Sequence, residues 1–149
     1  MKVSTKGRYG LRALLDIALH QDEGPLSIQS IAEHQGLPER YLEQLMVPLR
    51  KAGLVSSVRG PQGGYVLGRN PKDITVGNIV RALEGPVAPV ACVSEKCPED
   101  CRKAEICASR MVWAKVRDCI AAVLDSHSLA DLVEETRRIS TSGRLMYYI

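Results

Sequence analysis

The chain has 149 residues, of which 45% are hydrophobic and 25% charged, and a formal net charge of +3. This length suits one domain with an appendage, and the composition is that of an ordinary soluble globular protein. No apolar run reaches membrane-spanning length, and the N-terminal residues lack the apolar core of a signal peptide. The sequence therefore predicts a cytoplasmic protein without contact to a membrane.

Three helices are predicted in the first third of the chain. Apolar residues recur at helical spacing from about Thr5 to His20, and Gly24-Pro25 ends that pattern. Ser27 suits the N-cap of a short second helix that ends near Gln35-Gly36. Pro38 suits the first turn of a third helix. The apolar stripe of this third helix predicts a buried face made of Leu42, Leu45, Met46 and Leu49.

A β-hairpin is predicted next. Two β-type runs, Leu54–Arg59 and Tyr65–Leu67, flank the glycine-rich sequence Gly60-Pro61-Gln62-Gly63-Gly64. Three short helices followed by a hairpin are typical of a winged helix-turn-helix, in which the helix after the turn enters the major groove of DNA. The expected fold class is thus mainly α with a small β-hairpin wing, and the DNA-binding domain is expected over residues 1–85.

The second half of the chain predicts a loop and two further helices. Thr75 suits the N-cap of a helix that Gly85-Pro86 closes, and residues 86–108 then form a proline-bearing, cysteine-rich loop. Residues 109–149 are expected to form a long dimerisation helix and a tail, with a short last helix opened by Ser128 and Asp131. The apolar face expected to pair two subunits carries Val112, Val116, Cys119 and Val123, and Cys119 is expected to serve packing there.

Cationic residues favour contact with nucleic acid. Between Glu43 and Asp73 there are five cations and no acid, which suits a surface for phosphates. On the third helix, Gln44 can read adenine and Arg40 can bind guanine or phosphate, whereas Glu43 can accept from cytosine but repels phosphates. The five cations are Arg50, Lys51, Arg59, Arg69 and Lys72. The alternative is a helical interaction module whose cations are only solvated, and the pattern favours DNA binding over it.

The wing and the N-terminus supply further DNA-binding candidates. Arg59, at the base of the wing, is the best candidate for insertion into the minor groove, and Gly63 and Gly64 would let the hairpin backbone approach DNA closely. Lys6 belongs to a cationic N-terminal stretch that precedes the first acid, Asp16. The complete set of expected DNA-binding residues is Lys6, Arg40, Tyr41, Glu43, Gln44, Arg59, Gly63 and Gly64.

Four of the five cysteines lie within sixteen residues, at the spacing C-x4-C-x3-C-x5-C. In a reducing compartment, clustered thiols more often bind metal than form structural disulfides. Four thiolates suit either a zinc ion or an iron–sulfur cluster. The absence of C-x2-C weakens the zinc-ribbon interpretation and also argues against a thiol oxidoreductase. A zinc-stiffened interaction module remains open on this pattern. The candidate ligands are Cys92, Cys97, Cys101 and Cys107.

Three sequence motifs resemble a bacterial family of transcriptional regulators. They are Ser4-Thr5-Lys6-Gly7-Arg8-Tyr9-Gly10, Tyr41-Leu42-Glu43-Gln44-Leu45, and Gly53-Leu54-Val55 with Arg59-Gly60-Pro61-Gln62-Gly63-Gly64-Tyr65. In this order they are similar to the family that contains IscR, an iron–sulfur cluster regulator, CymR, a cysteine-metabolism repressor, and NsrR, a nitric-oxide sensor. The resemblance covers nearly the whole chain. It implies a dimeric winged-helix repressor in which Glu43, Gln44 and Arg59 contact DNA, with Tyr41 beside them.

The cysteine loop resembles that of IscR-type members, in which three cysteines hold a [2Fe–2S] cluster. The three matching residues are Cys92, Cys101 and Cys107. Arg110 stands where IscR has a histidine ligand, and a guanidinium offers no lone pair to iron. NsrR-like members use an acid near the N-terminus, where this chain has Arg8. Cys97 is an additional thiol and our hypothetical fourth ligand. CymR-like members lack these cysteines.

The sequence thus predicts a homodimeric, non-enzymatic regulator that binds a double-stranded DNA operator. The resemblance implies that it senses an iron–sulfur cluster, with [2Fe–2S] the expected type, and represses genes of iron–sulfur cluster assembly, with cysteine-supply genes as further targets. A nitric-oxide or redox sensor of the same family is the alternative within this class. A zinc-stiffened interaction module without DNA binding is the alternative outside it.

Overall fold

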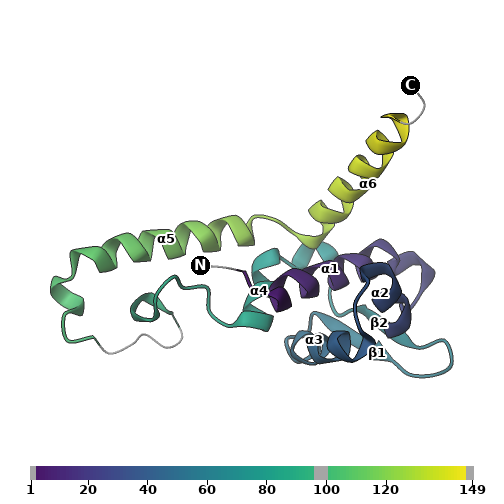
Figure 1. Cartoon of the computed structure of the whole chain (residues 1–149), viewed down its shortest axis with the longest axis horizontal. Helices are drawn as coiled ribbons and strands as arrows, with labels where there is room; N and C mark the ends of the chain where they lie inside the picture. Colours follow the sequence, from purple (N-terminus) through teal and green to yellow (C-terminus); the bar gives the residue numbers. More distant parts are fainter. Residues whose placement is uncertain (1–2, 96–100, 147–149) are drawn as a thin grey trace.

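The computed structural model describes residues 3–95 and 101–146, with side chains as far as residue 142. Four helices and a hairpin form a body from which the long helix α5 extends, and α6 projects from the same body in another direction (Figure 1). The helices are α1 (Thr5–Leu19), α2 (Ile28–Gln35), α3 (Glu39–Lys51), α4 (Val76–Glu84), α5 (Ala108–Asp125) and α6 (Leu129–Met146), and the strands are β1 (Val55–Val58) and β2 (Gly64–Leu67). None of the described helices is long and apolar enough to span a bilayer.

The predicted N-cap of the second helix is confirmed by its hydrogen bond. The hydroxyl of Ser27 accepts from the backbone N–H of Ser30 at 3.0 Å, which satisfies a free amide at the start of α2. Gly36 ends α2 in the left-handed region at φ 63°, a conformation that glycine adopts without strain. The chain therefore turns sharply from α2 into α3.

The core of the body is built on the predicted apolar stripe of α3. Leu42, Leu45, Met46 and Leu49 are all buried, and they belong to one cluster with residues of α1 and α2. Burial of each such side chain contributes about 1.5–3 kcal/mol. Helix α2 has only eight residues. A helix this short is marginal in isolation, so α2 depends on the packing of Ile31 and Ala32 in this core.

Helix α1 lies very close to α4, and glycines make that approach possible. A Cβ atom on Gly10 would lie 2.2 Å from Cδ1 of Leu83 on α4. At the start of α1, the backbone N–H and the hydroxyl of Ser4 both donate to the Glu84 carboxylate, at 2.9 and 2.8 Å. These contacts explain two residues of the first sequence motif: Gly10 leaves room for Leu83, and Ser4 binds Glu84.

The wing is the predicted antiparallel hairpin, with Val55 opposite Leu67 and Val58 opposite Gly64. The hairpin is also joined to the segment before α2. Tyr65 and Leu26 exchange two backbone hydrogen bonds, at 2.8 and 3.0 Å. The wing is therefore fixed to the helical body and not only to the end of α3.

The last helix differs from the prediction. It has 18 residues and is not short, although Ser128 and Asp131 cap it as expected, with the Asp131 N–H donating to Ser128 Oγ at 3.1 Å. Leu129 and Val133 are buried in the core of the body, and the Leu129 N–H donates to the carbonyl of Ile74 at 2.7 Å. The chain leaves the body after α4, and the start of α6 packs against that body again.

Candidate DNA-binding surface and cysteine loop

The exposed face of α3 presents three of the expected DNA-binding residues. Arg40, Glu43 and Gln44 are all exposed on it. Val47, one turn after Glu43 and Gln44, is 60% exposed and was missed by the sequence analysis. Its position outside the buried stripe of α3 is the signal by which the sequence could have identified it. An apolar side chain here can contact the methyl group of thymine. Together these residues form a continuous surface at helical spacing.

Tyr41 lies at the edge of this face and not within it. It is half-buried, and its ring packs edge-on against Tyr9 of α1, with centroids 6.2 Å apart and planes at 90°. The guanidinium of Arg12 lies 5.5 Å from the Tyr9 ring. Lys6 is exposed and lines the same hollow as Tyr41. Tyr41 therefore joins α3 to α1, and Lys6 extends the cationic surface beside it.

The wing places Arg59 in solvent directly after β1. The two glycines at its tip have a reason within the protein itself. A Cβ atom on Gly63 would lie 2.3 Å from the carbonyl oxygen of Val58, and one on Gly64 would lie 2.4 Å from that of Leu26. Both obstacles are backbone atoms, which cannot move aside. Gly63 and Gly64 are thus required by the hairpin's own packing, whatever their distance from DNA.

One of the five cations counted between Glu43 and Asp73 serves the fold. The Arg69 guanidinium donates to the carbonyls of Ala52 and Gly53, at 2.9 and 3.4 Å. These carbonyls follow the C-terminus of α3, where a positive charge is favourable. The other four, Arg50, Lys51, Arg59 and Lys72, are exposed and have no ion-pair partner in the part of the chain that the structure describes.

The cysteine loop connects α4 to α5. Cys92 and Cys107 are half-buried free thiols and Cys101 is an exposed one, whereas Cys97 lies outside the described residues. Within the described ranges, these cysteines do not form a group whose sulfur atoms all lie within 4.8 Å of one another. Cys119 is exposed on α5, so the packing expected of it does not occur within one chain.

Two arginines of α5 hold the start of the loop. Arg110 Nε donates to the carbonyl of Cys92 at 3.4 Å, and Arg117 Nη1 donates to that of Val93 at 2.8 Å. Arg110, which replaces the expected histidine, therefore binds the backbone of a candidate ligand residue. These bonds bring the Cys92 end of the loop back to the helix that begins after Cys107.

The surroundings of Cys107 favour its thiolate form. A hydrogen bond with the Ser109 hydroxyl, with 3.1 Å between sulfur and oxygen, lowers the pKa of Cys107, and the backbone N–H of Arg110 lowers it further. Cys107 also precedes the N-terminus of α5, where a negative charge is favourable. The thiolate is the form of cysteine that binds metals. The thiols present therefore fit a thiolate-bound metal or iron–sulfur cofactor.

The far end of α5 is joined to α4 by a bidentate ion pair. Arg81 Nη1 and Nη2 lie 2.6 and 2.8 Å from Oδ1 and Oδ2 of Asp125. The hydrogen bond from Arg81 holds the pKa of Asp125 below its usual value. Helix α5 is thus bound to the loop near its start and to the DNA-binding body near its end.

Comparison with known proteins identifies the family. Residues 3–135 match a family model described as "Rrf2: Iron-dependent Transcriptional regulator". The regulator CymR of Bacillus subtilis (strain 168) is 49% identical over 136 residues, which cover 91% of this chain and 92% of that one. IscR of Photorhabdus laumondii is 41% identical over 144 residues, which cover 97% of this chain and 86% of its relative.

Solved structures agree with these matches. The structure of B. subtilis CymR superposes with a TM-score of 0.74 at 49% identity, covering 91% of this chain and 98% of CymR. T. potens IscR gives 0.73 at 51% identity, covering 91% and 88%. The expected fold class and family are confirmed, and these relatives are named as regulators and not as enzymes. The chain belongs to the Rrf2 family of DNA-binding, winged-helix transcriptional regulators.

Proposed function

We propose that this protein is a homodimeric repressor whose affinity for its operator depends on an iron–sulfur cluster, of the [2Fe–2S] type, bound by the cysteine loop. The observation that carries the proposal is the position of the loop. It joins α4 of the DNA-binding body to α5, and α5 in turn binds the loop through Arg110 and Arg117. A change in the conformation of the loop therefore acts on both α4 and α5.

The cluster would be held by Cys92, Cys101 and Cys107, with Cys97 as the fourth ligand. The lowered pKa of Cys107 and the nearby positive charge of Arg110 support this assignment, because a cluster bound by thiolates carries negative charge. When bound, such a cluster makes the state of the loop depend on cluster supply and on oxidants. Residues of the chain itself connect the loop to the body. Arg110 and Arg117 of α5 bind the loop at Cys92 and Val93, and Arg81 holds the end of α5 on α4.

The homodimer is supported by the apolar surface of α5. No residue of α5 is buried in the single chain. Met111, Val112, Trp113 and Val123 are all large hydrophobic side chains with more than 40% exposure. A two-fold axis would bring this face against its own copy and cover both. It would also present two α3 helices to two half-sites of one operator. Such a regulator acts in the bacterial cytoplasm, where the chromosome lies.

Genes of iron–sulfur cluster assembly are the proposed targets, because the cysteine loop resembles that of IscR-type members. Cysteine supply is the second proposed target. A relative of 49% identity, CymR, is described as the global cysteine regulator of B. subtilis. A redox sensor of the same family is the second candidate function. It is favoured by one observation, the lowered pKa of the Cys107 thiol, since the thiolate is the form of cysteine that oxidants attack.

The test begins with anaerobic purification of the full chain. The proposal expects a coloured protein with visible absorption and with iron and sulfide bound in stoichiometric amounts. Operator affinity is then measured on one preparation before and after the cluster is removed, at fixed salt, because DNA binding varies steeply with salt. A colourless protein that contains zinc and does not bind DNA would establish the interaction module. A cluster-free protein whose DNA affinity changes on thiol oxidation would establish the redox sensor.

A further inference from the structure

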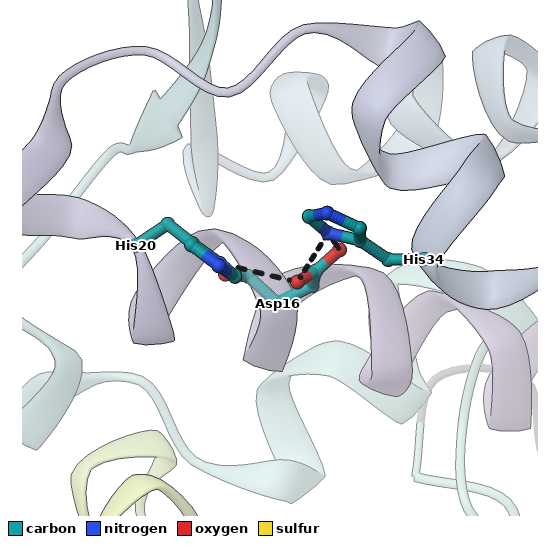
Figure 2. Close-up of side chains that lie close together, drawn as sticks. All are labelled: Asp16, His20 and His34. Atoms are coloured by element: carbon teal, nitrogen blue, oxygen red, sulfur yellow. Dashed lines mark hydrogen bonds and ion pairs between the residues drawn. The ribbon is translucent and has the colours of Figure 1, made fainter.

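A second group of metal-ligating side chains lies on α1 and α2, outside the cysteine loop. Asp16 and His20 are one turn apart on α1, and His34 comes from the last turn of α2. His20 Nδ1 lies 3.2 Å from Asp16 Oδ1, and His34 Nδ1 lies 3.0 Å from Oδ2. Figure 2 shows the two imidazoles directed at the carboxylate from α1 and from α2. Among the described residues, this is the group of three whose ligand atoms all lie within 4.8 Å of one another.

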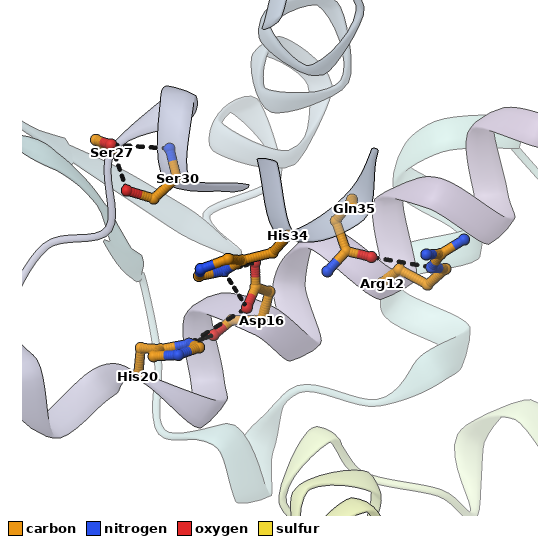
Figure 3. Close-up of polar contacts among 7 residues, drawn as sticks. All are labelled: Arg12, Asp16, His20, Ser27, Ser30, His34 and Gln35. Carbon is orange, nitrogen blue, oxygen red and sulfur yellow. Dashed lines mark hydrogen bonds and ion pairs between the residues drawn. The ribbon is translucent and has the colours of Figure 1, made fainter. Parts of the chain in front are cut away.

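The Asp16 carboxylate is buried, and no fixed cation faces it. Its side chain is 6% exposed, and its side-chain partners in the described part of the chain are the two imidazoles. Arg12, one turn earlier on α1, donates instead to Gln35 at 2.9 Å (Figure 3). A buried carboxylate is costly unless its charge is compensated. The groups placed to compensate it are therefore His20 and His34, by hydrogen bonds or through a metal ion that they share with Asp16.

We propose that Asp16, His20 and His34 bind a divalent transition-metal ion of the Zn²⁺ class. Two imidazole nitrogens and a carboxylate oxygen are a ligand set that these ions prefer. Bonds of about 2.0–2.2 Å to one ion place neighbouring ligand atoms about 3.0–3.4 Å apart, from octahedral to tetrahedral geometry. The observed separations of 3.0 and 3.2 Å between Nδ1 and carboxylate oxygen fit that spacing. An ion fits these two separations, and the two histidine ligand atoms, which lie within 4.8 Å of each other, would move together around it.

The surroundings of the two histidines allow them to change tautomer, as metal binding requires, and leave room for further ligands of the metal. The side chains of His20 and His34 are 30% and 42% exposed, so water can complete the coordination shell. Each imidazole would carry its proton on Nε2 and offer the Nδ1 lone pair to the metal. Neither Nε2 atom has a hydrogen-bond partner among the described residues. For His34 the change of tautomer affects only the contact with the Asp16 carboxylate, whereas His20 gives up the hydrogen bond from its Nδ1 to the backbone carbonyl of Asp16 at 2.9 Å.

Metal binding would join the end of α1 to the last turn of α2. His34 is followed directly by Gln35 and Gly36, where the chain turns toward α3. An ion bound here would stabilise the helix-turn-helix, because a ligand that binds only the folded state shifts unfolding by mass action. This nitrogen–oxygen site differs from the cysteine loop both in its ligands and in its place in the fold.

The probe is Co²⁺, added to the full chain purified anaerobically with the cofactor of its cysteine loop in place. The chain has three histidines, so the third supplies a matched control. His127, which is exposed between α5 and α6, is not part of the cluster. We expect His20→Gln and His34→Gln to weaken Co²⁺ binding at least tenfold, and His127→Gln to leave it unchanged. In the wild-type protein, NMR should show paramagnetic shifts of the His20 and His34 imidazoles and not of His127.

Thermal unfolding in metal-free buffer separates loss of a ligand from loss of the fold. Both glutamine variants are expected to fold, because neither side chain is buried, and to unfold at a somewhat lower temperature, because each histidine contacts the buried Asp16 carboxylate. If a variant does not fold, the wild-type NMR shifts decide the question. The proposal is overturned if Co²⁺ binds equally to His34→Gln, if it binds only with the intense near-ultraviolet absorption of a thiolate complex, or if it does not bind. In each of these cases Asp16 and the histidines form a hydrogen-bonded network and no metal site.

Discussion

Two arginines near the wing have opposite roles although they are the same residue type. Arg69 donates to the carbonyls of Ala52 and Gly53, which places its charge at the C-terminus of α3. Arg59 is exposed, and it has no ion pair within the described ranges. Neither role can be assigned from the charge pattern, because both arginines lie in the same acid-free stretch. The difference lies in the hydrogen bonds that each guanidinium makes.

Replacement of Arg59 by alanine should therefore weaken DNA binding without weakening the fold. If Arg59 makes a good base contact, the loss of specific binding free energy is about 1–3 kcal/mol. The measurement is operator affinity at fixed salt, together with the unfolding temperature. Arg137→Ala, on the exposed side of α6, removes the same charge away from the wing and serves as the control. Unchanged affinity in the Arg59 variant would remove the wing from the proposed interface.

A second prediction at this scale concerns the fourth cluster ligand. Cys97→Ala should lose or destabilise the cluster about as severely as Cys92→Ala, Cys101→Ala or Cys107→Ala, because Arg110 cannot replace a missing thiolate. Iron content and the visible spectrum of anaerobic protein are the measurements. Cys119→Ala is the matched control, since that thiol lies on α5 and outside the loop. Full iron content in the Cys97 variant would show that another residue completes the site.

At the scale of elements, the junction between α4 and α5 depends on a small residue. A Cβ atom on Gly77 of α4 would lie 1.9 Å from Oδ1 of Asp125 and 2.6 Å from Nη1 of Arg81. Glycine at this position leaves the space in which the two charged groups pair. The bidentate pair then connects the body to the end of the proposed dimerisation helix.

This ion pair should make stability depend on pH in acid. The pKa of Asp125 is lowered in the folded protein, chiefly by the hydrogen bond from Arg81. Its contribution is therefore complete above the unfolded value of about 3.9 and is lost as the pH falls through the lower, folded pKa. Because both side chains are partly exposed, the contribution is on the order of 1 kcal/mol or less.

Thermal unfolding of wild type and Asp125→Asn between pH 7 and pH 3 tests this expectation. The variant should unfold at a lower temperature at pH 7, and the difference should become smaller as the pH falls toward 3. Asp22→Asn is the control, because Asp22 is exposed and has no ion pair in the described part of the chain. A difference that is constant with pH would mean that the pair does not contribute through the charge of Asp125.

At the scale of the whole molecule, the features that the sequence predicts are those that depend on residues close together along the chain. Ser27 caps α2 and the apolar stripe of α3 is buried, both as predicted, and the DNA-binding candidates Arg40, Glu43 and Gln44 are exposed as expected. The length of α6 was not predicted, because the burial of its first turns requires a partner surface near Ile74 that no local pattern reveals.

Side-chain groups that come from separate helices were also beyond the sequence. The spacing of Asp16 and His20 places them on one face of a helix. That His34 completes the group follows only from the packing of α2 against α1. The same reason applies to Gly64, whose neighbour Leu26 lies far from it along the chain. The cysteine loop could be identified by spacing alone, since its residues are local.

Dimerisation is a property of the whole molecule and can be tested on α5. Val116→Glu would bury a charge in the proposed interface, which is costly without a partner. We expect sedimentation to show a monomer that no longer holds an operator with two half-sites. Gln21→Glu adds the same charge on an exposed residue of the body and is the control. A wild-type protein that sediments as a monomer at micromolar concentration would contradict the dimer.

The return of α6 to the body has a consequence for how such proteins diversify. The Val76 N–H donates to the carbonyl of His127 at 2.9 Å, and the Leu129 N–H donates to that of Ile74 at 2.7 Å. The chain leaves the body after the end of α4 and re-enters it beside the start of the same helix, as a guest sequence does in a host domain. Excursions with adjacent ends tolerate insertion and exchange well. Evolution can therefore rewrite the loop and α5 for a new signal while α4 and the rest of the host that reads DNA are inherited unchanged.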